Sequence, residues 1–500
     1  MKKRLRAPAA LLALAALLTP AAARLAVPVQ AAGPLDRINH VIVIYQENWS
    51  FDSLYPDFPG ANGLAGATGA APQVDKTGRP YVTLPQPADP SKKPPVPDPR
   101  FPADLPPAPF ALERYVPADQ KIDDIPVRFY QEQYQIDGGK MDKFVAWSTA
   151  AGLGMGFYAA TQAPEGRLAQ QYTMADNFFH AAFGGSFLNH FWLVSTSAPT
   201  WPNAPAAQVV QLDANGALVK DGNVTPDGYA VNTVYPAGGP YPAAITNTAQ
   251  LLPAQTMPTI GDRLNEGGVS WAWYSGGWND AQAGHPDPLF QFHHQPFAYF
   301  ANYAPGTPAR AAHLKDEQDF LRALSTNDLP AVSFVKPIGA NNEHPGYATL
   351  LAGQQHVADL VSAVQASPYW QDTAIVITYD ENGGFWDHVA PPAGDRWGPG
   401  TRVPTIVISP YAKKGFVDHT QYDTTSILKT IELRWNLAPL GTRDTAATPL
   451  TNAFTFTAAA APAGMPVTGV PEPWPLLAGG GVLALLLGGL ALRRRRAALR

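Results

Sequence analysis

The sequence has no cysteine and few charged residues, and both shortages narrow its possible chemistry. With no cysteine among 500 residues, it can form no disulfide, thiolate metal site or thiol nucleophile. Charged residues make up only 15% of the chain and hydrophobic residues 46%, so it can bury a large core. The 52 prolines and 43 glycines predict a globular protein with many irregular loops.

The formal charge of −5 conceals a strongly acidic body. Five cations lie in residues 1–32 and five in 473–500, where there is no Asp or Glu, so residues 33–472 carry −15. A body of this charge repels polyanions at long range, which argues against nucleic acid as a partner. Any anionic substrate must therefore be attracted by local groups.

The first 32 residues have the pattern of a signal peptide. Lys2, Lys3, Arg4 and Arg6 precede an apolar run at 9–18, and small residues follow. A buried N-terminal helix is the alternative. The pattern predicts export, with the Sec machinery as a partner, and a periplasmic, cell-surface or secreted location.

The C-terminal residues suggest a linker and a sorting signal. Residues 445–469 are rich in Ala, Thr and Pro, which is typical of a flexible linker. Val-Pro-Glu-Pro at 470–473, an uncharged stretch at 474–492 and an Arg cluster at 493–496 follow. The stretch is long enough to span a bilayer. Residues 470–500 resemble the PEP-CTERM sorting signal, whose tail an exosortase is thought to remove, so the span is either transient or a plain membrane anchor.

Between these ends, β-branched runs alternate with helical spacing. The runs lie at 38–45, 269–274, 331–335, 374–379 and 403–409. Stretches with helical spacing lie at 314–324 and 347–365. The alternation predicts an α/β fold with a mostly parallel sheet, covered by helices on both faces, in one domain over 33–444. Residues 56–118 and 199–258 lack a period and are expected to form long loop insertions.

Two acidic clusters follow two of these runs directly. Glu47 and Asn48 come after the first, and Asp380 and Glu381 after the fourth. Ligands of parallel sheets collect at the carboxyl ends of strands, so these side chains are expected to meet. Converging carboxylates need a cation, and oxygen ligands suit a divalent metal. The alternative is that each cluster caps a helix or turn.

A glycine pair precedes the best candidate for a nucleophile. Gly184 and Gly185 allow a sharp turn, after which Ser186 would begin a helix. Free backbone N–H groups at a helix start favour an anion or a developing alkoxide. A serine hydroxyl still needs a base or metal to activate it. A simple N-cap serine is the alternative.

Histidines form another layer of candidates beside proline or acidic residues. They are His190, His293, His294, His344 and His388. Such side chains could bind phosphate oxygens, protonate a leaving group or ligate the metal. Each one taken singly is more often structural.

Four motifs together resemble the bacterial phosphoesterase family of phospholipases C and acid phosphatases. They are Ile-Asn-His-Val-Ile-Val-Ile-Tyr-Gln-Glu-Asn-Trp-Ser-Phe-Asp at 38–52, Gly-Gly-Lys-Met-Asp-Lys-Phe at 138–144, Glu-His-Pro at 343–345 and Tyr-Asp-Glu-Asn-Gly-Gly-Phe-Trp-Asp-His-Val-Ala-Pro-Pro at 379–392. They occur in the family's order and span about residues 36–437. The resemblance implies a three-layer α/β/α, alkaline-phosphatase-like sandwich and one metal site.

The resemblance also implies roles for particular residues. Glu47, Asn48, Asp380 and Glu381 would hold the metal, and Ser186 would be a nucleophile that also touches it. Asn189, His293, His294 and His344 would complete the catalytic set, with the His side chains on the phosphoryl group. Many relatives have Pro-Asn-Arg where this chain has Leu188-Asn189-His190, and a His where it has Val127. The leaving-group acid therefore stays unassigned.

The expected function is hydrolysis of phosphate esters through a phosphoseryl intermediate and one divalent metal ion. Oxygen ligands admit calcium, magnesium or manganese, and added His admits zinc or iron. The substrate is either a phosphomonoester or a phospholipid. A sulfatase is one alternative, although Leu188 and His190 break the sulfatase pattern C/S-x-P-x-R. A non-catalytic surface or exopolysaccharide-associated protein on the same fold is the other.

Overall fold

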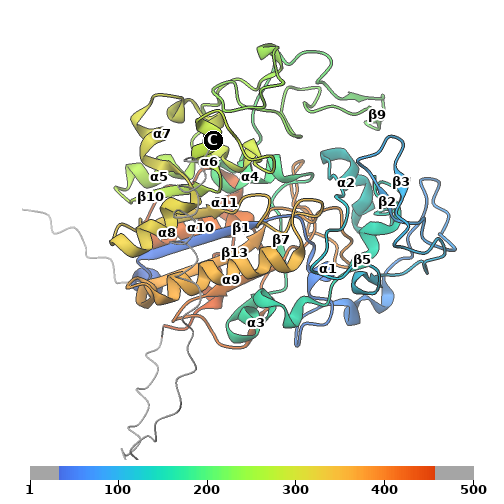
Figure 1. Ribbon diagram of the computed structural model, residues 1–500, viewed down its shortest axis with the longest axis horizontal. Helices are drawn as coiled ribbons and strands as arrows, with labels where there is room; N and C mark the ends of the chain where they lie inside the picture. Colours follow the sequence, from blue (N-terminus) through green and yellow to red (C-terminus); the bar gives the residue numbers. More distant parts are fainter. Residues whose placement is uncertain (1–32, 457–500) are drawn as a thin grey trace, which may run out of the picture. The chain divides into compact units, whose positions relative to one another are not determined.

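An eight-stranded sheet runs through the middle of the protein (Figure 1). The computed structural model describes residues 33–456. In spatial order the strands are β11 (Leu314–Lys315), β10 (Trp271–Ser275), β12 (Val332–Lys336), β1 (His40–Gln46), β13 (Thr373–Tyr379), β14 (Thr405–Ile408), β6 (Thr173–Ala175) and β15 (Phe416–Asp418). Of these eight, β14 alone runs against its neighbours. The predicted α/β fold with a mostly parallel sheet is confirmed.

The five predicted runs all form strands of this sheet. Every residue of β10, β12, β13 and β14 is buried, so both faces of the sheet are covered. β-Branched residues fill such strands because their side chains pack well on a pleated surface that is buried on both sides.

Helices pack on the faces of the sheet. They are α1 (Phe51–Leu54), α2 (Phe129–Ile136), α3 (Pro164–Gln171), α4 (Ser186–Ser195), α5 (Ile260–Glu266), α6 (Trp278–Gln282), α7 (Pro308–His313), α8 (Glu317–Thr326), α9 (Leu350–Ala366), α10 (Thr424–Trp435) and α11 (Thr442–Ala446). α9 lies in front of β1 in Figure 1 and contacts α3 and α8, whereas α4 contacts α10 and α5.

The two predicted helical stretches form α8 and α9, with one shifted start. α8 begins at Glu317 because Asp316 caps it, accepting a hydrogen bond from Gln318 N at 3.2 Å. Leu314 and Lys315 instead extend the sheet as β11, beside β10. The prediction that the helix begins at 314 is therefore wrong by one turn.

The long insertions carry only short regular elements. Residues 56–118 contain β2 (Ala88–Asp89), β3 (Val96–Pro97) and β4 (Phe110–Ala111), and residues 199–258 contain β8 (Gln211–Leu212) and β9 (Leu218–Lys220). The remaining short strands are β5 (Gly156–Phe157), β7 (Phe178–Phe179) and β16 (Tyr422–Asp423).

The body continues past the predicted boundary at 444. A 3-10 helix, Leu450–Ala453, follows α11, and Leu450, Ala453 and Phe454 are buried. Residues 445–456 therefore pack on the body instead of starting the linker, because their Leu and Phe side chains find apolar partners there. The rest of the linker, the signal peptide (1–32) and the sorting signal with its span (474–492) lie outside the described residues. Among the described helices, none is both long and apolar enough to cross a membrane.

Candidate active site

Three adjacent strands deliver polar side chains to one edge of the sheet. β12 ends at Lys336, β1 is followed by Glu47 and Asn48, and β13 by Asp380 and Glu381. β1 pairs in parallel with both β12 and β13, so the three carboxyl ends lie side by side. The predicted meeting of the two acidic clusters at the end of the sheet agrees with this geometry.

Glu47 is the centre of the group, and its two oxygens face different partners. Oε2 accepts a hydrogen bond from Ser186 Oγ at 3.3 Å. Oε1 lies 2.8 Å from His294 Nε2 and is in ion-pair contact with Lys336 Nζ. Burial alone would raise the pKa of Glu47, but His294 and Lys336 outweigh it and hold the pKa well below its usual value. Glu47 is therefore an anion.

Asn48 and Asp380 complete the surroundings of the Ser186 hydroxyl. Asn48 adopts a left-handed backbone conformation (φ 68°), and its Oδ1 lies 3.5 Å from Ser186 Oγ. The N–H of Asn48 donates to Asp380 Oδ1 at 3.3 Å. The other carboxylate oxygen of Asp380, Oδ2, is buried and accepts no hydrogen bond. Burial and the charge of Glu47 raise the pKa of Asp380 to about 7, against the opposing effect of Lys336.

Ser186 is the first residue of α4, as the sequence predicts. Gly184 has φ 89°, a conformation that favours glycine, and Gly185 leads into the helix in extended conformation. No Cβ fits at Gly184, since it would lie 2.8 Å from the backbone nitrogen of Phe129. The turn therefore presents the Ser186 hydroxyl at a helix N-terminus, where free N–H groups favour negative charge.

Two buried side chains hold this turn, and one of them was predicted to be catalytic. Asn189 accepts from Ala182 N at 2.9 Å and donates to the carbonyls of Ala182 and Gly184 at 3.0 and 3.1 Å. Its amide is thus committed to the backbone, and it acts as a positioning residue. The prediction that Asn189 is catalytic is not supported by these contacts.

Glu132 of α2 is the second of these side chains, and the sequence analysis missed it. It accepts from Gly184 N at 2.5 Å and lies 2.9 Å from His180 Nε2. His180 Nδ1 in turn lies 3.4 Å from Asn189 Oδ1. Burial would lower the pKa of His180, but Glu132 outweighs it and raises that pKa. A carboxylate inside a short helical motif gives no signal in the sequence that it supports a distant turn.

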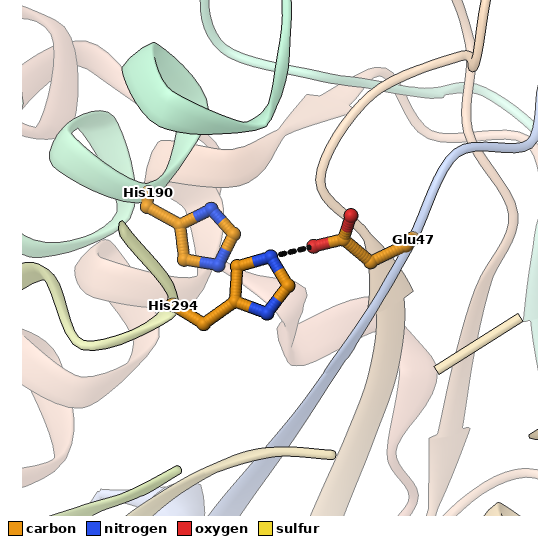
Figure 2. A group of neighbouring side chains, drawn as sticks. All are labelled: Glu47, His190 and His294. Carbon is orange, nitrogen blue, oxygen red and sulfur yellow. Dashed lines mark ion pairs between the residues drawn. The ribbon is translucent and has the colours of Figure 1, made fainter. Parts of the chain in front are cut away.

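Three neutral histidines line the side of the site next to Glu47. Figure 2 shows His190 and His294 with their rings close to the Glu47 carboxylate; the two rings stack with centroids 5.1 Å apart. Burial lowers the pKa of His190 and His293 well below the usual value, and that of His294 to about 4. His190 Nδ1 donates to Ser186 O at 2.7 Å, which leaves Nε2 as a bare acceptor.

His344 lies beside Asn48 and the Oε2 atom of Glu47. Its Nδ1 is 2.6 Å from Pro345 O, so Nε2 is free to accept from Asn48 Nδ2 at 3.2 Å. Nε2 also lies 3.8 Å from Glu47 Oε2. The ring stacks on Tyr347 at a centroid distance of 4.0 Å, which fixes its orientation. His344 therefore lies beside Glu47 and Asn48, and its predicted contact with the phosphoryl group stays a prediction.

Glu381 is turned into its own loop. Its Oε2 accepts from Gly383 N at 2.6 Å. Burial and the neighbouring Asp380 raise the pKa of Glu381 well above its usual value. A cation would have to displace this proton before Glu381 could serve as the predicted metal ligand.

Lys336 was missed by the sequence analysis although it lies at the centre of the site. It is fully buried, touches Glu47 and lies 3.4 Å from Gln46 O. The available signal was a lysine that ends a run of apolar strand residues, a position where a solvated charge is not expected.

His388, named with the other histidines, belongs with Asp387 to a separate cluster. Arg402 donates to Asp387 Oδ1 at 2.9 Å and to Asp52 Oδ1 at 3.1 Å. His388 Nδ1 lies 2.6 Å from Asp52 Oδ2. A buried guanidinium therefore neutralises this acidic pair, and the cluster ties the loop after β13 to α1.

The residues around Ser186 fit a divalent metal ion. Asp380 Oδ2, His190 Nε2 and His293 Nδ1 are buried and make no hydrogen bond. Buried polar atoms without partners are rare and costly unless an ion or water satisfies them. Carboxylate, amide and hydroxyl oxygens from Glu47, Asp380, Asn48 and Ser186 are suitable ligands for such an ion.

Comparison with protein families identifies one match. The profile of the Phosphoesterase family matches residues 38–438. The "Non-hemolytic phospholipase C" of Pseudomonas aeruginosa is 27% identical, over 87% of this chain and 60% of that protein. "Phospholipase C B" of Mycobacterium tuberculosis is 26% identical, over 85% of this chain and 79% of that one. The chain thus spans less than two thirds of the Pseudomonas relative.

Solved structures with similar folds are more distant. A Vibrio parahaemolyticus protein of the alkaline phosphatase superfamily has a TM-score of 0.32 and 12% identity, covering 67% of this chain and 74% of its own. The phosphonate monoester hydrolase of Agrobacterium radiobacter has a TM-score of 0.32 and 10% identity, covering 80% and 74%. These similarities are too low to bear on function.

Proposed function

This chain belongs to the phosphoesterase family, and from that premise we propose that it hydrolyses phosphate esters with Ser186 as nucleophile and one divalent metal ion. The observation that carries the proposal is the Ser186 hydroxyl at the start of α4, 3.3 Å from Glu47 and 3.5 Å from Asn48. Beside it, Asp380 offers a buried oxygen that makes no hydrogen bond.

The reaction divides into two displacements at phosphorus. Ser186 Oγ attacks phosphorus and loses its proton to solvent, while the P–O bond to the alcohol breaks and the departing oxygen takes a proton from solvent. Water then attacks the phosphoseryl ester and releases Ser186. A bound divalent ion would supply a Lewis acid that lowers the pKa of the hydroxyl and balances phosphoryl charge.

The residues of the chain orient the reactants and balance the remaining charge. Glu47, Asn48, Asp380 and Ser186 would hold the ion. The N-terminus of α4 would favour the anionic phosphoryl group, and His293, His294 and His344 would donate hydrogen bonds to its oxygens. Glu132 and Asn189 keep the turn before Ser186 in place. Phospholipid is our proposed substrate because the relatives are named phospholipases C.

Ser186→Ala tests the proposal. We expect loss of at least about three orders of magnitude in kcat on para-nitrophenyl phosphate, para-nitrophenyl phosphorylcholine and phospholipid, because the covalent route is removed. Ser195→Ala is a matched control: it removes a buried hydroxyl from the same helix, bonded to Phe191 O at 2.8 Å, and should leave turnover nearly unchanged. An active Ser186→Ala protein would refute the nucleophile.

A further inference from the structure

Lys336 places its ammonium group inside the candidate site, in ion-pair contact with Glu47. Its side chain is fully buried, and Glu47 is the carboxylate it touches. Burying an ammonium group costs several kcal/mol unless a partner compensates it. A lysine retained at such a position therefore needs a role that water or an apolar side chain could not fill.

The two oxygens of Glu47 divide the site into two halves. The half around Oε2 holds Ser186 and, at 3.8 Å, His344. The half around Oε1 holds Lys336 and, at 2.8 Å, His294. One carboxylate bridging two cationic positions is also the arrangement by which two-metal phosphatases hold ions about 3.5–4 Å apart.

The Oε1 half contains a set of ligands that would suit a metal. One atom each from Glu47, His190 and His294 lie within 4.8 Å of one another (Figure 2). His190 Nε2 makes no hydrogen bond and carries no proton, since Nδ1 donates to Ser186 O. Two imidazoles and a carboxylate are a common zinc ligand set. The ammonium group of Lys336 lies against this set.

We propose that Lys336 occupies the position of a second metal ion and thereby limits the site to one. This rests on the proposed function, in which a single ion is held in the Oε2 half. The lysine neutralises Glu47 Oε1 and repels a divalent ion from the His190–His294 pair. It also provides fixed positive charge for the phosphoryl group without a need for a second metal.

Zinc stoichiometry tests the proposal independently of catalysis. Purified wild-type protein, stripped and reloaded with Zn²⁺, should contain about one ion per chain, and Lys336→Ala about two, by elemental analysis and calorimetry. Adding His190→Ala to Lys336→Ala should return the count to about one. Lys315→Ala, which removes a partly exposed lysine from the neighbouring β11, should leave one. A count of one in Lys336→Ala would overturn the proposal, whereas a wild type that binds neither Zn²⁺ nor Mn²⁺ would refute the proposed metal site.

A second variant decides the question if Lys336→Ala does not fold. If the wild-type ion lies in the Oε2 half, His190→Ala in the wild-type background should change the Zn²⁺ affinity by less than about threefold. If instead the ion lies between His190 and His294, the affinity should fall by about a hundredfold or more, since a ligand is lost. That loss would overturn the proposal.

Discussion

Among residues 33–456, two groups of carboxylates and histidines place possible metal ligands close together, and the two groups differ in how their polar atoms are paired. In the cluster of Asp52, Asp387 and His388, Arg402 supplies three hydrogen bonds to the carboxylates. In the cluster around Ser186, Asp380 Oδ2 and His190 Nε2 make none. Both clusters place metal-ligand atoms close together.

The difference teaches that composition does not identify a metal site. In the first cluster the guanidinium of Arg402 donates to Asp52 and Asp387, so this cluster connects α1 to the loop after β13. The other cluster has a buried carboxylate oxygen, Asp380 Oδ2, without a hydrogen bond, which a bound cation would supply with a partner. Unpaired atoms, and not the count of acidic residues, distinguish the two.

Removing Arg402 should have the largest effect. Arg402→Met removes the guanidinium that donates to both Asp52 and Asp387 and leaves these buried carboxylates without that cation, which we expect to cost about 3–5 kcal/mol of unfolding free energy. Chemical denaturation should show this loss, while the content of divalent metal in the folded fraction stays unchanged. An unchanged free energy of unfolding would mean that the cluster around Arg402 does not stabilise the fold.

Asp380→Asn should act on turnover and hardly on stability. The change removes a negative oxygen beside Ser186 but keeps the size of the side chain, and we expect a loss of about two to three orders of magnitude in kcat. Steady-state kinetics at saturating metal measures it. The matched change in the other cluster, Asp387→Asn, should lower the melting temperature instead. Equal losses of kcat in Asp380→Asn and Asp387→Asn would mean that the two clusters do not differ in their contribution to catalysis.

Glu132→Gln should give a smaller and specific defect. Its amide replaces the anionic acceptor of Gly184 N, a charge-assisted hydrogen bond worth about 1.5–3 kcal/mol, so the turn before Ser186 loosens. We expect kcat to fall about tenfold to a hundredfold with KM nearly constant. Glu132→Asp should restore part of the rate if the charge matters. A change in KM alone would contradict a role in positioning Ser186.

The pH dependence of metal binding should be the mildest effect. The pKa of Asp380 is raised to about 7, so the folded protein keeps a proton there that the unfolded chain loses near pH 4. The metal-free protein therefore loses stability as pH rises from about 4 to 7. A divalent ion competes with that proton, so its stabilisation should grow between about pH 5.5 and 8, measured as the shift in melting temperature.

The same pH series has a built-in control. The pKa of His294 is lowered to about 4, so it does not titrate in this window. Asp380→Asn should therefore flatten the pH dependence of the metal-induced shift. A shift that is equally pH-dependent without Asp380 would assign the effect to another group.

Much of the site could be predicted because it depends on local sequence. Buried strands can be recognised in the sequence as runs of β-branched residues. Because β1 and β13 pair in parallel, Glu47 and Asp380 lie close together although 333 positions separate them. The Gly184-Gly185 turn predicts the start of α4. These features follow from backbone geometry, which a short stretch of sequence encodes.

What could not be predicted depends on tertiary partners. Asn189 accepts a hydrogen bond from the backbone of Ala182, and Glu132, on another helix, accepts one from Gly184 N. The buried Lys336 is paired with Glu47, which directly follows the neighbouring strand β1. Residues 445–456 look like linker by composition, yet Phe454 finds a buried place on the body. None of these partners is visible from the sequence around each residue.

The most direct test of the central claim is a crystal structure of residues 33–456 grown with Mn²⁺, with anomalous diffraction recorded at the manganese edge. The account predicts one strong peak within about 2.0–2.6 Å of Glu47 Oε2, Asp380 Oδ2 and the Ser186 hydroxyl. A peak between Asp52 and Asp387, or none at all near Ser186, would contradict it.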